Sequence, residues 1–136
     1  MVLGFLFGKK EGRRGRTAVG VLKPFDKEKI KNDWEKIEQL EQTQRPSALK
    51  EAVISADKLL DYALLQIASG EGMGERLKNA GEAFPRDSYA IYQGLWDAHK
   101  MRNALVHEPD FDLTNLVARD VLAKFKRGFQ SLGVRI

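Results

Sequence analysis

Hydrophobic residues recur at spacings of three and four over most of this chain, which is the spacing of one face of an α-helix. Over residues 25–43 the apolar positions Ile30, Trp34, Ile37 and Leu40 follow this rule, and Lys and Glu fill many of the positions between them. This pattern predicts a first amphipathic helix. No segment shows the alternation of apolar and polar residues that is typical of a strand.

A second helix is predicted to begin at Pro46, because proline is favoured at the first position of a helix. Its apolar positions form a stripe broad enough for the centre of a bundle. They are Leu49, Ala52, Val53, Ala56, Leu59, Leu60, Ala63, Leu64 and Ile67. The glycine-rich run 69–74 predicts a turn, and a short helix is expected over 75–84, before Pro85.

Two further helices complete the pattern. Asp87 or Ser88 is placed to cap the first of them, which is expected to run to residue 107, before Pro109. Asp112 or Thr114 is placed to start the last helix, which is expected to end near residue 133. Four main helices and one short helix predict an all-α fold, an antiparallel helical bundle.

The first 24 residues differ from the rest in charge. They hold six basic residues against one acidic residue, a net of +5, whereas 17 basic and 18 acidic residues leave 25–136 at −1. Glycine and arginine dominate residues 8–20, and so few apolar residues cannot offset the entropy of ordering the chain. We therefore expect a flexible basic N-terminal arm over 1–24 and one helical domain over 25–136.

The arm also bears on location. Its apolar residues precede its basic residues, which is the reverse of a secretory signal, and the chain has no apolar run long enough to span a membrane. It also has no cysteine, which excludes disulfides and thiolate metal sites. We expect a cytoplasmic protein. Leu3, Phe5, Leu6 and Phe7 could still contact a membrane surface or a protein partner, or the arm could fold back on the domain.

The candidate chemistry lies near the end of the fourth predicted helix. His99, Asn103 and His107 are spaced by four and share a helical face, and Arg102 precedes Asn103. The planar guanidinium of an arginine can hold two phosphate oxygens, and an imidazole transfers protons near neutral pH. The last helical turn also favours a protonated ring at His107. These groups suit chemistry at a phosphodiester.

A structural explanation of the same residues stays open. His107 could simply satisfy the last carbonyls of the helix, while Arg102 pairs with Asp97, Asp110 or Asp112. His99 is more typical of a hydrogen-bonded interface residue than of a second catalytic group.

Two carboxylates on the second predicted helix, Asp57 and Asp61, are also four residues apart. Their default placement is a solvated face of the helix. The alternative is that they reach the cleft and orient an imidazole.

The segment 95–114, centred on the residues WDAHKMRNALVHEP, resembles the motif helix of the HEPN (higher eukaryotes and prokaryotes nucleotide-binding) superfamily. In that family an arginine is followed by a polar residue and, four to six residues after the arginine, by a histidine. Arg102, Asn103 and His107 match each element of this signature. The resemblance covers roughly residues 27–132 and implies an all-α fold.

The resemblance implies a homodimer whose two motif helices meet and form a metal-independent endoribonuclease site without a cofactor. RNA would be cut to 2′,3′-cyclic phosphate and 5′-hydroxyl ends, and DNA is not expected as a substrate. By analogy, His107 moves the proton, Arg102 stabilises the phosphoryl oxygens and Asn103 orients the phosphate. Weaker candidates for RNA contact are Lys9, Lys10, Arg13, Arg14, Arg16 and His99.

Toxin members of the family often carry a tyrosine two residues after the histidine, where this chain has Pro109. This difference argues against silencing at that tyrosine, although another cognate protein inhibitor stays open. The alternative function is a catalytically silent HEPN-type module that dimerises or binds a nucleotide or a protein partner. A third alternative is a structural adaptor tethered by its N-terminal arm.

Overall fold

A computed structural model describes residues 19–136, and this part of the chain is helical, with no strand. Its helices are α1 (Pro24–Thr43), α2 (Pro46–Ile67), α3 (Met73–Asn79), α4 (Tyr89–His107) and α5 (Asn115–Ser131). Two 3-10 turns, η1 (Ala80–Ala83) and η2 (Arg86–Ser88), link α3 to α4. The predicted all-α bundle of four main helices and one short helix is confirmed.

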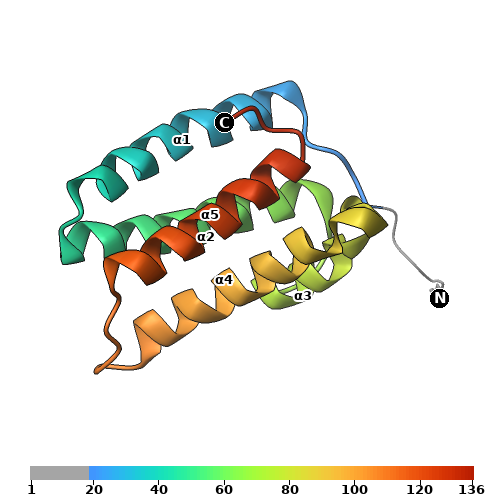
Figure 1. The fold of residues 1–136 in the computed structure, drawn as a ribbon. Coiled ribbons are helices and arrows are strands. Elements are labelled where there is room, and N and C mark those ends of the chain that lie inside the picture. Colours follow the sequence, from blue (N-terminus) through green and yellow to red (C-terminus); the bar gives the residue numbers. More distant parts are fainter. Residues whose placement is uncertain (1–18) are drawn as a thin grey trace.

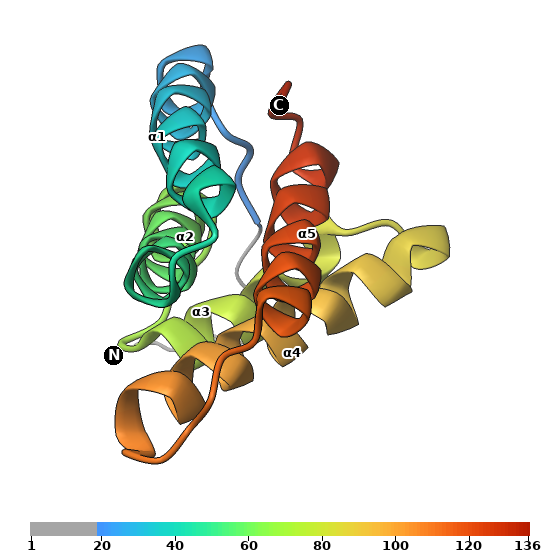
Figure 2. The ribbon, with the colours of Figure 1, turned by 60° about the vertical axis from the view of Figure 1, so that its left-hand side comes forward.

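The four long helices form two antiparallel hairpins, α1 with α2 and α4 with α5 (Figure 1). In Figures 1 and 2, α2 and α5 lie between α1 and α4, so α1 and α4 occupy opposite sides of the bundle. Helix α4 packs on α2 and α5, and the hydroxyl of its Tyr92 donates to the carbonyl of Leu77 in α3 (2.8 Å). Its exposed side chains include Tyr89 and Val106.

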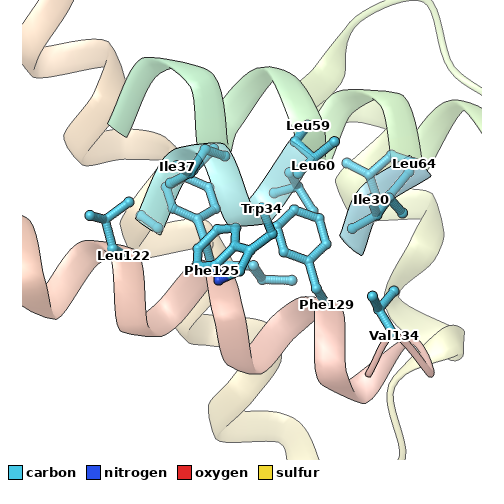
Figure 3. Packing of buried hydrophobic residues seen from close by; sticks show 14 of the residues in the cluster. Ile30, Trp34, Ile37, Leu59, Leu60, Leu64, Leu122, Phe125, Phe129 and Val134 are labelled. Atoms are coloured by element: carbon cyan, nitrogen blue, oxygen red, sulfur yellow. The ribbon is translucent and has the colours of Figure 1, made fainter. Parts of the chain in front are cut away.

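The core joins α1, α2 and α5 through large apolar side chains (Figure 3). Trp34 of α1 is only 2% exposed and meets the ring of Phe129 of α5 edge to face, with ring centroids 5.6 Å apart. Ile30, Leu60 and Phe125 complete the same cluster and are fully buried. Each such side chain contributes about 1.5–3 kcal/mol when it leaves water, so the apolar stripes seen in the sequence hold the hairpins together.

A buried carboxylate ties the start of α1 to α2. The backbone N–H of Lys23 donates to Asp26 Oδ2 (3.1 Å), and the Tyr62 hydroxyl donates to Asp26 Oδ1 (2.9 Å). Asp26 thereby caps the first turn of α1 and fixes its position on α2. Loss of contact with water raises the pKa of Tyr62 above its usual range, and the hydrogen bond to Asp26 raises it further.

The folded part begins before residue 24, where the sequence placed the end of the arm. Leu22 is buried, and the Gly20 N–H donates to the carbonyl of Ile67 (2.8 Å). Residues 19–23 therefore lie along the end of α2 and belong to the helical body. The sequence missed this contact because the partner, Ile67, is distant in the chain.

Several predicted helix ends agree with the structure and others do not. Thr114 caps α5, since its Oγ1 accepts the N–H of Val117 (3.2 Å), whereas Ser88 precedes α4 without such a side-chain bond. Helix α3 begins at Met73, two residues before the predicted start, and therefore includes Gly74. No helix described here has both the length and the apolar character that crossing a bilayer requires.

Candidate functional site

The motif residues occupy the second half of α4, on the side of the bundle opposite α1. Arg102 and Asn103 are half-buried and His107 is exposed at the helix end. The side chain of His99 is 13% exposed and is packed toward α2. The face that these residues share therefore runs from the interior at His99 to solvent at His107.

The buried carboxylate of Asp57, on α2, contacts two of these residues. Its side chain is 4% exposed; Oδ1 lies 2.9 Å from His99 Nδ1 and Oδ2 lies 3.5 Å from Arg102 Nε. The expectation that Asp57 lies on a solvated face is wrong, because α4 packs over this part of α2 and removes the carboxylate from water. The alternative was that this carboxylate orients an imidazole. The contact between Asp57 and His99 agrees with it.

The other carboxylate, Asp61, has a separate partner. Arg76 of α3 donates to Asp61 Oδ1 through Nε (3.2 Å) and Nη2 (2.6 Å), and through Nη1 to the carbonyl of Gly70 (2.9 Å). This arginine ties the glycine-containing turn and α3 to α2. Asp61 therefore stabilises the turn and makes no contact with the motif residues.

The guanidinium of Arg102 is held from two sides. Nη1 donates to Asn103 Oδ1 (2.9 Å), while Nε is buried against Asp57 at an ion-pair distance but without a hydrogen bond. The structural alternative, in which Arg102 pairs with Asp97, Asp110 or Asp112, differs from the contact found here, because the carboxylate that faces Arg102 is Asp57 of α2. Of the three carboxylates considered, Asp97 lies 3.9 Å from Lys124 of α5 instead.

The charges of this cluster compensate one another. A buried carboxylate is costly in free energy unless cations and donors face it, and Asp57 faces a guanidinium and an imidazole. Because a carboxylate only accepts hydrogen bonds, we assign the His99 proton to Nδ1, which donates to Asp57.

The candidate RNA contacts Lys9, Lys10, Arg13, Arg14 and Arg16 lie outside the described residues. Residues 19–136 contain 18 basic and 18 acidic side chains, so the helical body has no net charge and the excess lies in residues 1–18. Within the helical body, no three His, Asp or Glu side chains gather as a metal-binding group.

Comparisons with protein-family models, with curated proteins and with solved structures found no match. The residues of α4 and their contacts are therefore the guide to function. Among the residues that α4 contacts, Asp57 was predicted to lie on a solvated face of its helix and is buried instead. A signal was available, because Asp57 stands four residues after Val53 and three before Leu60, in line with the apolar stripe.

Proposed function

We propose that this chain is a HEPN-type, metal-independent endoribonuclease that works as a homodimer in the cytoplasm. The observation that carries the proposal is the arrangement on α4, where an oriented Arg102 adjoins Asn103 and an exposed His107 follows at the end of the same helix. A cation with a fixed orientation, an amide and an accessible imidazole are the groups that phosphodiester cleavage needs.

In the proposed reaction the ribose 2′-oxygen bonds to the adjacent phosphorus and the bond from phosphorus to the 5′-oxygen breaks. The proton of the 2′-hydroxyl passes to solvent water, and protonated His107 supplies the proton that the departing 5′-oxygen takes up. The imidazole then regains a proton from solvent. Arg102 stabilises the negative charge that develops on the phosphoryl oxygens, and Asn103 orients them. DNA lacks the attacking hydroxyl and is not a substrate of this reaction.

A second copy of the chain completes the proposed site. Helix α4 lies at the side of the bundle (Figure 2). Its exposed residues include Val106, which is 44% exposed and precedes His107 in the chain. Pairing of two α4 helices across a two-fold axis removes this apolar surface from water. It also brings the motif residues of both subunits to one cleft.

One observation favours a different function, a catalytically silent module. The guanidinium of Arg102 already contacts Asp57 and Asn103, as an arginine with a purely structural role would do. The described helical body also has no net positive charge to attract RNA. A silent module would dimerise or bind a nucleotide or protein through the same face of α4 without cleaving RNA.

Cleavage of a labelled single-stranded RNA separates the two functions. We expect Arg102→Ala and His107→Ala each to lower kcat by about 100-fold or more, the scale of lost electrostatic or acid-base catalysis. Lys100→Ala, which removes an exposed cation from the same helix, should retain most activity. EDTA should leave the rate unchanged, since the proposed groups act without a metal ion.

The products and the mass of the protein give further readouts of this experiment. We expect 2′,3′-cyclic phosphate ends, no cleavage of DNA of the same sequence, and a light-scattering mass of twice 15.4 kDa. Equal cleavage by wild type and by the Arg102→Ala, His107→Ala double variant would identify a contaminating nuclease. Absence of cleavage by a folded wild-type dimer would support the silent module.

A further inference from the structure

We propose that Asp57 is the positioning residue of this site, because its carboxylate orients the guanidinium of Arg102 toward the phosphate. The inference rests on the proposed ribonuclease function, and it adds a residue from a second helix that lies outside the motif. Asp57 would contact no RNA. It would act through Arg102, and through His99 it would also hold the preceding turn of α4.

Asp57 is a buried carboxylate among apolar neighbours. Its side chain is 4% exposed, and its neighbours on α2, Val53 and Leu60, are completely buried. Removing a carboxylate from water is costly in free energy until its partners offset the loss, and well-packed apolar residues are often as stable as a buried ion pair. An apolar residue would therefore suffice for packing here, and the carboxylate points to a role in orientation.

The two oxygens of Asp57 face different residues. Oδ1 lies 2.9 Å from His99 Nδ1, and Oδ2 lies 3.5 Å from Arg102 Nε. Because residues 99 and 102 are neighbours across one turn of α4, one carboxylate fixes both the rotation of the helix and the Nε edge of the guanidinium. Asn103 Oδ1 then holds Nη1 at 2.9 Å.

The guanidinium of Arg102 has donors besides Nε and Nη1. An arginine has five N–H donors in a planar fork. Within residues 19–136, Arg102 Nη2 makes no hydrogen bond and is not among the buried unpartnered atoms, and the side chain is 28% exposed. The contacts with Asp57 and Asn103 therefore leave Nη2 available to phosphoryl oxygens. The contacts of Arg102 with Asp57 and Asn103 would serve structure alone in a silent module. They also suit a guanidinium that is held ready to donate hydrogen bonds to a phosphate.

The test compares Asp57→Asn with Asp61→Asn in RNA cleavage. Asp57→Asn keeps the shape but removes the charge facing Arg102, and we expect kcat to fall by about 100-fold while KM changes only a few fold. Asp61 lies one turn further along α2 and also pairs with an arginine, Arg76, so its variant is a matched control. We expect Asp61→Asn to cleave at nearly the wild-type rate.

A second measurement is independent of cleavage. In nitrogen-15 NMR spectra of the wild-type protein, Arg102 Nε–H and His99 Nδ1–H should exchange slowly with water, because the buried Asp57 faces both groups. Exchange of Arg102 Nε–H should become faster in Asp57→Asn, because no negative charge then faces this group, and it should stay slow in Asp61→Asn. If Asp57→Asn does not fold, rapid exchange of Arg102 Nε–H in the wild type would still overturn the inference.

The outcomes for the two proposals differ. If His107→Ala abolishes cleavage while a folded Asp57→Asn protein retains wild-type kcat, the ribonuclease proposal stands and the role of Asp57 is wrong. If the wild type does not cleave RNA, the ribonuclease proposal fails. The exchange measurement then still decides whether Asp57 orients Arg102. A lower melting temperature with unchanged kcat would assign Asp57 a structural role only.

Discussion

At the scale of single residues, Gly128 sets how closely α4 and α5 approach. A Cβ atom at this position would lie 2.4 Å from Leu95 Cδ2, far inside van der Waals contact. Leu95 is fully buried between the helices and has little room to move. A glycine is therefore needed here for space, although glycine is a poor helix former.

Substitution of two helical glycines should consequently have opposite effects. Gly128→Ala should destabilise the protein by about 1–2 kcal/mol, because overpacking of the core exceeds the gain in helix propensity. Gly74→Ala, where a Cβ would meet nothing within 4 Å, should instead stabilise it by about 0.5 kcal/mol. Urea unfolding measures both values. Equal stabilisation by the two substitutions would mean that α4 and α5 separate at little cost.

At the scale of helices, α1 is anchored to α2 through the hydrogen bond from the Tyr62 hydroxyl to Asp26. Only the neutral phenol donates this bond, and the pKa of Tyr62 is raised by burial and then by Asp26. The hydrogen bond therefore contributes its full share of the free energy of unfolding at pH values below the ordinary tyrosine pKa. It is lost as the pH rises from that value through the raised pKa of the folded state.

The pH dependence of Tyr62→Phe tests this anchor. We expect the variant to be less stable than the wild type at neutral pH and the difference to shrink as the pH rises through the tyrosine range. Tyr89→Phe is the control, since Tyr89 is 61% exposed and its hydroxyl accepts a hydrogen bond from Gln93 in the next turn of α4. A stability difference for Tyr62→Phe that is constant with pH would contradict the anchor.

At the scale of the whole molecule, charge is distributed unevenly, because the helical body from residue 19 onward is neutral. Any long-range attraction to RNA should therefore come mainly from residues 1–18. A deletion that tests this must stop at residue 18. The buried Leu22 belongs to the helical body, and its removal would expose apolar surface at the end of α2.

Deletion of residues 1–18 should weaken RNA binding at low salt. Each lost phosphate contact should reduce the slope of log affinity against log salt by about 0.7 for single-stranded RNA. Single-turnover cleavage at saturating protein should change only a few fold. The matched control keeps the length and replaces the basic residues Lys9, Lys10, Arg13, Arg14 and Arg16 with glutamine. An unchanged salt slope in both proteins would exclude this segment as an RNA contact.

Local sequence patterns account for most of the helices. The apolar spacing that predicted α1 depends on residues such as Ile30 and Trp34, which lie a turn apart and are both buried. Pro46 and Thr114 favour the starts of the helices at which they stand, α2 and α5. These starts can therefore be predicted from the local sequence. The start of the helical body was missed because the Gly20 bond to Ile67 joins distant parts of the chain.

The fold class and the placement of Arg102, Asn103 and His107 on one helix could be predicted from the sequence, because both follow from the period of the α-helix. The carboxylate that faces Arg102 and His99 could not, because it depends on how the helices pack. Asp57 and His99 are 42 residues apart in the chain and meet because α4 packs across α2. Periodicity describes the faces of one helix. The partner of a buried charge depends on how two helices pack, and that is set by the whole core.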